Sequence, residues 1–254
     1  MILNDYINSG GAAASGVPLY GVEIELEGIP YMPNGTRALR RFQTVEDGSL
    51  RGASVELVSN PPMNKEALLQ VLDGADNFVS QCRASLRTSV HIHVDARRFT
   101  PQQVASVVMM YALFERVFFE VSGDRSGNPF CMPLTSMDFL QRIQGAMSMW
   151  RRGSWAPLPP LDSLKYSAFN LGHLYGQGSI EFRHHAGVES VAPIKTWLNS
   201  IDAFVEWAAS KDCERIVNVN PRLYAAWSRK VGEMFGTTVT SDYYDALLNL
   251  KAVI

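Results

Sequence analysis

The chain has 254 residues, 46% of them hydrophobic and 19% charged, which is ordinary for a globular protein that buries a sizeable core. The formal net charge of −2 argues against bulk electrostatic attraction to nucleic acid or to an anionic membrane. Cys82, Cys131 and Cys213 lie far apart and are odd in number, so they offer neither a disulfide framework nor zinc-ligand spacing. We therefore expect a reducing, cytoplasmic setting.

The N-terminal segment does not resemble a signal peptide, because Asp5 comes early and no Lys or Arg precedes its apolar residues. The longest apolar run lies within residues 104–114, which is too short to cross a bilayer, and Glu115 and Arg116 end it. We expect no membrane partner. Residues 1–18 are rich in Gly and Ala and predict a flexible arm before the first strand.

Residues 20–28, YGVEIELEG, show the period-two alternation of a β-strand with one buried face. The apolar face carries Val22, Ile24 and Leu26, and the opposite face carries Glu23, Glu25 and Glu27. Carboxylates this close together must be solvated, paired with cations or bound to metal. Taken alone, this stretch is more simply interpreted as an exposed strand with a solvated acidic face.

Further strands are predicted from alternation and from bounding turn residues, at residues 39–47, 52–58, 87–95, 165–172 and 178–184. Helices are predicted from apolar periodicity, with Asn64 capping the first and Thr100 and Pro101 beginning the second. They span residues 64–82, 101–121, 135–149, 193–210, 221–234 and 241–250. Strands fill the first half and helices dominate the end, which favours an α+β fold with a mainly antiparallel sheet.

One segment, residues 123–164, is irregular, with clusters of Gly, Pro and Arg around a short helix. Such a segment is more often a lid or a binding loop than a linker. Its Arg151 and Arg152 could reach a phosphate, or they could be two solvated charges. We expect one domain over residues 19–254, in which 123–164 is a lid-like insertion and 193–254 are C-terminal helices.

Other predicted strands also place chemically active side chains opposite an apolar face. These side chains are His91 and His93, Glu181 and Arg183, and Glu56. Oxygen ligands with one imidazole suit Mg²⁺ or Mn²⁺ better than zinc, and an arginine among them fits a phosphate that must also be held. Singly, such a histidine is usually structural and such an arginine usually forms a salt bridge. The indication of a site comes from several strands that agree.

Motifs of other enzyme classes are absent from the sequence. No Gly-Lys-Ser/Thr occurs, so there is no P-loop, and no serine lies in a nucleophile elbow. The glycines at 172, 176 and 178 are explained by a hairpin turn rather than by a dinucleotide fingerprint.

Several segments in order resemble the signature of the amidoligase family. That family belongs to the carboxylate–amine ligase superfamily, with glutamine synthetase and glutamate–cysteine ligase. The segments are YGVEIELE, VEDGSL followed by GASVELVSNP, RTSVHIHVD, DRSGNPFC, KYSAFNL and SIEFRHHAG, within about residues 19–190. The resemblance implies a glutamine-synthetase-like antiparallel, partly closed β-sheet with flanking helices, whose concave face binds ATP and divalent metals. It also implies a catalytic domain that phosphorylates a carboxylate, after which an amine displaces phosphate to form an amide.

By position, the resemblance implies roles for individual residues. Glu23, Glu25, Glu56, His93 and Glu181 match metal ligands, some of which also contact nucleotide phosphate. Arg183 matches the arginine that holds the transferred phosphoryl group, so Arg183, Glu181 and Glu56 are the candidate catalytic residues. Arg125, Lys165 and Asn170 match weaker positions that touch phosphate or substrate. His91 either binds metal itself or supports the residues that do. At position 165 the resemblance leads us to expect Arg about as often as Lys, and Lys165 is a point charge rather than a bidentate donor.

The carboxylate and amine substrates stay open: a side chain, a small metabolite, a cell-wall peptide and a modified nucleobase all fit. Nucleic acid is not expected otherwise, and an oligomer is suggested only by analogy with glutamine synthetase relatives. Two alternatives remain. A metal-dependent hydrolase would use His91 and His93 with the carboxylates but leaves Arg183 without a role. A catalytically silent binding module would keep the sheet without turnover.

Overall fold

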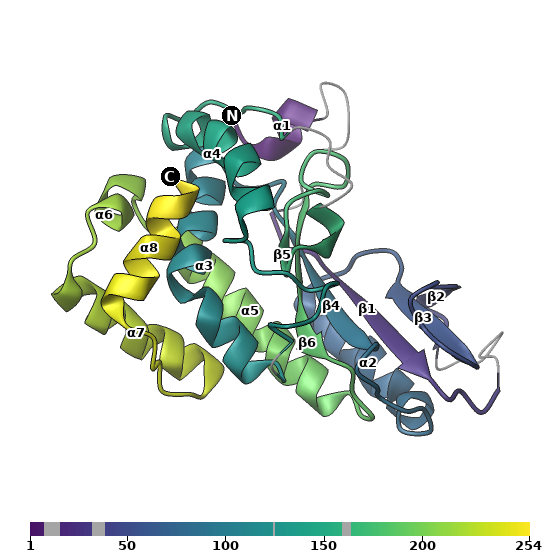
Figure 1. The fold of residues 1–254 in the computed structure, drawn as a ribbon. Helices are drawn as coiled ribbons and strands as arrows, with labels where there is room; N and C mark the ends of the chain where they lie inside the picture. Colours follow the sequence, from purple (N-terminus) through teal and green to yellow (C-terminus); the bar gives the residue numbers. More distant parts are fainter. Residues whose placement is uncertain (8–15, 32–38, 124, 159–163) are drawn as a thin grey trace.

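The computed structural model describes residues 1–7, 16–31, 39–123, 125–158 and 164–254, and these have a mixed α+β architecture (Figure 1). Within them, six strands form one open antiparallel sheet in the order β2-β3-β1-β4-β6-β5. The strands are β1 (Tyr20–Glu27), β2 (Phe42–Val45), β3 (Ser54–Ser59), β4 (Ser89–Asp95), β5 (Phe169–Asn170) and β6 (Ser179–Ala186). The α+β class with an antiparallel sheet is therefore confirmed.

The described helices gather mainly on one side of the molecule (Figure 1). They are α1 (Leu3–Ile7), α2 (Lys65–Val79), α3 (Pro101–Val121), α4 (Met137–Arg151), α5 (Ala192–Ala209), α6 (Cys213–Val217), α7 (Pro221–Phe235) and α8 (Tyr243–Val253). A 3₁₀ turn, η2, spans Leu164–Tyr166. Helices α2, α5 and α3 pack on β1, β4 and β6 respectively, so they cover the apolar face of the sheet.

Helix α3 is the centre of the helical layer, since it contacts α4, α5 and α8 and buries nearly all of its side chains. Its predicted beginning is confirmed by a reciprocal capping box. Gln103 N–H donates to Thr100 Oγ1, and Thr100 N–H donates to the Gln103 side chain. Asn64 likewise caps α2 by accepting a hydrogen bond from the Ala67 N–H at 2.9 Å.

The alternation predicted from the sequence holds on every central strand. The apolar side chains of one face are fully buried beneath the helices: Val22, Ile24, Leu26, Leu57, Ile92 and Phe182. Because side chains alternate, the opposite face receives the glutamates, the histidines and Arg183. The register aligns them across strands, with Glu25 opposite Glu56, Glu23 opposite His91, and His93 opposite Glu181.

The sheet does not close as we expected. Strands β2 and β5 are its two edges, and no described strand joins them. The predicted strand at residues 165–172 shrinks to Phe169–Asn170 because its first residues form the 3₁₀ turn η2. An edge strand this short cannot extend the sheet into a partial barrel.

Two short helices were not predicted, α1 and α6. Leu3 of α1 is fully buried, and the Leu3 and Asn4 N–H groups donate to the carbonyls of Phe99 and Arg97. Residues 3–7 therefore pack on the domain instead of belonging to a flexible arm. Residues 8–15 of the predicted arm lie outside the described residues.

The central part of the predicted lid belongs to the helical layer. Ile143, Met147 and Trp150 of α4 are fully buried, and α4 packs against α3 and α8. Arg151 pairs with Glu214 at 3.4 Å, so it is held at α6 rather than at a phosphate site. Residues 124 and 159–163 of the predicted insertion lie outside the described residues.

Cys82, Cys131 and Cys213 are buried and form no disulfide with one another. Among the helices that the structure describes, none combines the length and the apolar character needed to cross a lipid bilayer.

Candidate functional site

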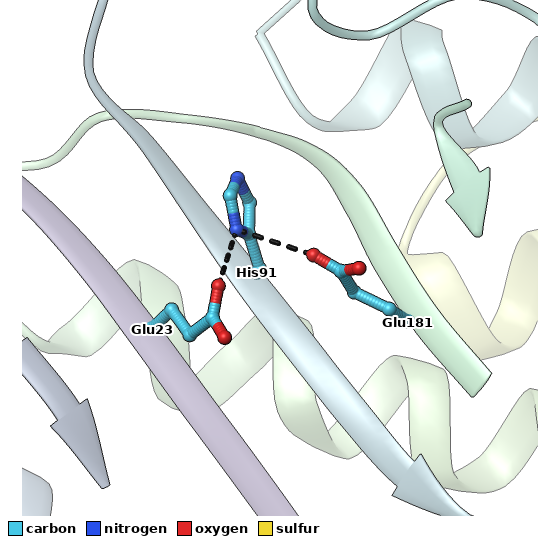
Figure 2. Close-up of side chains that lie close together, drawn as sticks. All are labelled: Glu23, His91 and Glu181. Carbon is cyan, nitrogen blue, oxygen red and sulfur yellow. Dashed lines mark hydrogen bonds and ion pairs between the residues drawn. The ribbon is translucent and has the colours of Figure 1, made fainter. Parts of the chain in front are cut away.

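Three central strands bring two carboxylates and one imidazole into contact on the polar face of the sheet (Figure 2). Glu23 comes from β1, His91 from β4 and Glu181 from β6. The Nδ1 atom of His91 lies 2.8 Å from Glu23 Oε2 and 3.3 Å from Glu181 Oε1. His91 and Glu181 are almost completely buried, so this contact is shielded from solvent.

A second set of carboxylates meets the other nitrogen of the same imidazole. His91 Nε2 lies 2.8 Å from Ser89 Oγ and 3.8 Å from Glu25 Oε1. The Ser89 hydroxyl donates a hydrogen bond to the buried carboxylate of Glu25. Glu56, directly across from Glu25, completes the second set. His91 is thus shared by two acidic groups of side chains.

Glu181 is surrounded by further polar partners. Arg183 Nη1 lies 2.6 Å from Glu181 Oε1, and Asn170 Nδ2 donates to Glu181 Oε2 at 2.6 Å. His173 Nε2 approaches the same oxygen at 3.3 Å. His93 Nε2 lies closer to Glu23, at 3.0 Å, than to Glu181. The contacts from Arg183 and Asn170 hold the Glu181 carboxylate in one orientation.

A β-bulge lies on β6 at Arg183, which alternation from Glu181 places on this face. Val90 pairs with His185 and Ile92 with Phe182, so His91 alone stands opposite both Arg183 and His184. A bulge of this kind changes the direction of the side chains around it. Arg183 turns toward Glu181, while His184 is fully buried on the other face, where its Nε2 contacts Tyr111 Oη at 2.8 Å.

The carboxylates have divergent electrostatic environments. Burial opposes ionisation of Glu23 and Glu181, but hydrogen bonds with histidines, aided for Glu181 by the Arg183 charge, hold the pKa of both carboxyls far below the usual range. Glu56 forms no ion pair within the described residues, and burial, followed by the charges of Glu23 and Glu25, raises its pKa to about 8. Part of the rise in the Glu56 pKa comes from repulsion by the charges of Glu23 and Glu25, which a bound cation would relieve.

The donor set fits a hard divalent cation. Ligand atoms of Glu23, His91 and Glu181 lie within 4.8 Å of one another, and so do those of Glu25, Glu56 and His91. Carboxylate oxygens dominate both groups, a composition that suits Mg²⁺ or Mn²⁺ better than zinc.

A cationic cavity of about 430 Å³ adjoins the cluster and shares Glu25, Ser89 and Arg183 with it. We call it the Arg125 cavity. Its other charged lining residues are Arg87, Arg125, Lys165 and Asp47, and Phe130 and Tyr166 lie beside them with ring centroids 5.7 Å apart. Cations outnumber carboxylates in this lining.

Arg125 is the most constrained of these cations. It is only 8% exposed, and no carboxylate of the described residues forms an ion pair with it. Its Nη1 donates to the Arg183 carbonyl at 3.0 Å, whereas its buried Nε has no hydrogen-bond partner. Burial lowers the pKa of its guanidinium. A buried, unpaired cation is costly, so this side chain is suited to an anionic ligand.

A second cavity, of about 200 Å³, lies at the other end of the cluster, where Glu23 and His93 belong to its lining. We call it the Gly21 cavity, because Gly21 lies in its wall and has no side chain to fill it. Val58 and Pro62 line it together with Asp95 and Arg97. The polar face of the sheet therefore carries a line of three features: a cationic cavity, an acidic cluster and a second cavity.

The structure brings most of the predicted site residues together. Glu23, Glu25, Glu56, His91, His93, Glu181, Arg183 and Asn170 form the cluster, and Arg125 and Lys165 line the adjoining cavity. Glu27, the third carboxylate of the first strand, instead accepts a hydrogen bond from the Arg51 N–H. Sequence reasoning missed Ser89 and His173. Ser89 could have been found because it lies two residues before His91, whereas His173 lies in a turn without periodicity.

Comparison with known proteins adds no family assignment. A scan of the chain against models of protein families finds no match, and a search of curated proteins finds no significant relative. Function is therefore inferred from the residues of the site and their surroundings.

Proposed function

We propose that the chain is an ATP-dependent carboxylate–amine ligase, assisted by Mg²⁺ or Mn²⁺, that forms an amide bond through an acyl phosphate. One observation carries the proposal: an acidic cluster suited to divalent cations adjoins a cavity in which Arg125 is buried and forms no ion pair with any described residue. A site of this kind can hold a phosphorylated nucleotide and its metal ions side by side. The amidoligase resemblance and a glutamine-synthetase-like origin of the open sheet belong to the same proposal, as does a cytoplasmic setting.

In this proposal the residues have distinct tasks. Glu23, Glu25, Glu56, His93 and Glu181, with His91, would hold the metal ions, which when bound offset the negative charges of the reacting phosphate and carboxylate. Arg183, oriented by Glu181, holds the transferred phosphoryl group, and Asn170 fixes Glu181 from the other side. Arg125 and Lys165 hold further anionic oxygens of the nucleotide. Phe130 and Tyr166 offer ring faces at the same cavity.

A thermal-unfolding titration tests the proposal. The protein is measured with Mg²⁺, with a non-hydrolysable ATP analogue, and with both together. A ligand present at a hundred times its dissociation constant stabilises by about 2.7 kcal/mol, which gives a clear shift. We expect the shift only with both present and expect Glu181→Ala to abolish it. No shift in any combination would overturn the ATP-binding claim.

A metal-dependent hydrolase is the second candidate, and one observation favours it. His173, not foreseen from the sequence, lies near His93 with ring centroids 5.5 Å apart and contacts Glu181. Three histidines and several carboxylates could thus hold a hydrolytic metal. A hydrolase of this kind gives no task to the buried Arg125. Metal-dependent ester or amide hydrolysis without any ATP binding would favour it over the ligase.

A further inference from the structure

The glycine at position 21 has no backbone explanation. Its φ is outside the left-handed region that favours glycine, and it lies within β1, paired with His93. Glycine weakens a strand because it loses the most backbone freedom on folding and has no side chain to pack. Inside a strand it often marks a place where a ligand approaches the backbone closely. A Cβ at this position would lie 3.4 Å from the Cβ of His93 and 3.7 Å from Ser59 Oγ, so alanine would fit. What the glycine provides is open space on the face that bears Glu23.

That space is the Gly21 cavity, whose charged groups are already paired. Arg97 holds both oxygens of Asp95, at 2.8 and 3.0 Å, and His93 holds Glu23 at 3.0 Å. Val58 and Pro62 supply apolar surface. The unpaired cations of the described site lie instead in the Arg125 cavity. The Arg125 cavity, at one end of the cluster, therefore suits anionic reactants. The Gly21 cavity, at the other end, suits a ligand whose main part carries no charge.

We propose that the Gly21 cavity binds the amine substrate, and that it selects a primary amine carried on a slim, apolar chain. This assignment rests on the ligase function proposed above. The nitrogen lies at the cluster end, beside the carboxylate of Glu23, and the chain lies over Gly21 between Val58 and Pro62. The carboxylate substrate and the nucleotide approach from the Arg125 side, so the two reactants reach the cluster from opposite ends.

Ligand-observed NMR titrations of the protein, without nucleotide, test the assignment. The probes are n-alkylamines from methylamine to hexylamine, with the alkanoates of equal length as the comparison series. Each methylene that the cavity buries should strengthen amine binding about fourfold, until the cavity is full. The alkanoates should bind at least tenfold more weakly than the matching amines.

Two variants fill the cavity from different walls. Gly21→Val adds bulk beside His93, whereas Val58→Phe adds it from β3, which does not pair with the strand of His93. Both should weaken hexylamine binding at least tenfold and leave unfolding cooperative. Gln43→Phe is the matched control, because Gln43 is opposite Val58 on the neighbouring strand but does not line the cavity. Its affinity for hexylamine should equal that of the unaltered protein.

The assignment is overturned by alkanoates that bind as well as amines, by affinity independent of chain length, or by unchanged binding in both variants. It is also overturned if adenosine displaces hexylamine, which would place the nucleoside in this cavity. Failure of the ligase function gives a different pattern. In that case hexylamine binds as described here, but Mg²⁺ with the ATP analogue produces no thermal shift.

Discussion

Oε2 of Glu23 lies 2.8 Å from Nδ1 of His91, although the two residues are 68 positions apart in the chain. Glu181 approaches the same nitrogen at 3.3 Å, so two carboxylates from separate strands converge on one imidazole. Burial makes such convergence unfavourable unless a proton or a metal cation balances it. The arrangement is therefore the natural place to test for a divalent ion.

Glu181→Gln should weaken Mn²⁺ binding by about 10- to 100-fold, as expected when a residue that binds or orients a metal is altered. The amide keeps the volume but removes the charge that faces Arg183 and the histidines, and its NH₂ group cannot accept the hydrogen bond that Arg183 or Asn170 donates to the carboxylate. Titration of Mn²⁺ followed by electron paramagnetic resonance measures the change. Glu120→Gln, an exposed carboxylate paired with Arg116 on α3, is the control and should bind Mn²⁺ normally. Equal affinity in both variants would exclude Glu181 from the metal site.

Glu56→Gln should alter the pH dependence of stability in protein freed of metal with a chelator. The pKa of the folded carboxyl is raised from 4.5 to about 8, so its contribution is fully present below pH 4.5 and is lost as pH rises to 8. At pH 9 the variant should be more stable than the unaltered protein by about 1 to 2 kcal/mol, a discounted figure because solvent screens this half-buried group. Urea unfolding at pH 5, 7 and 9 measures it. A difference that does not change with pH would contradict the prediction.

Arg125→Met should separate anion binding from folding. The variant loses a buried guanidinium that forms no ion pair within the described parts of the chain, so its stability should change by only about 1 kcal/mol. Its affinity for the ATP analogue with Mg²⁺ should fall at least tenfold, since charged hydrogen bonds contribute about 1.5 to 3 kcal/mol. Isothermal titration calorimetry measures the affinity, with the exposed Arg116→Met as control. An unaltered dissociation constant would remove Arg125 from the anion site.

His184→Gln should flatten the loss of stability in acid. Burial among aromatic rings, followed by the charges of Arg125 and His185, lowers the pKa of His184 to about 3. Because the unfolded chain takes up this proton near pH 6.5, stability falls as pH drops from 6.5 toward 3 by up to about 1.4 kcal/mol per unit. The variant should lose this one-proton slope, measured by urea unfolding between pH 7 and pH 4. Parallel profiles for both proteins would show that His184 is protonated in the folded state.

The central strands and the faces they present could be read from the sequence. Alternation on β1 separates Glu23 and Glu25 from Val22 and Ile24, and this separation is preserved because burial of the apolar face fixes it. Capping residues likewise set where α2 and α3 begin. These features depend on neighbours within a few residues, so local physics decides them.

Tertiary structure alone decided which polar side chains meet. The strand order and register place Glu23 opposite His91 and His93 opposite Glu181, and the bulge on β6 places Arg183 and His184 together opposite His91. The burial of Arg125 and the two cavities follow from the packing of distant segments. So does the place of α4, whose buried residues fix it in the helical layer. Local periodicity specifies which face a residue occupies, whereas contacts between segments far apart in the chain specify its partners there.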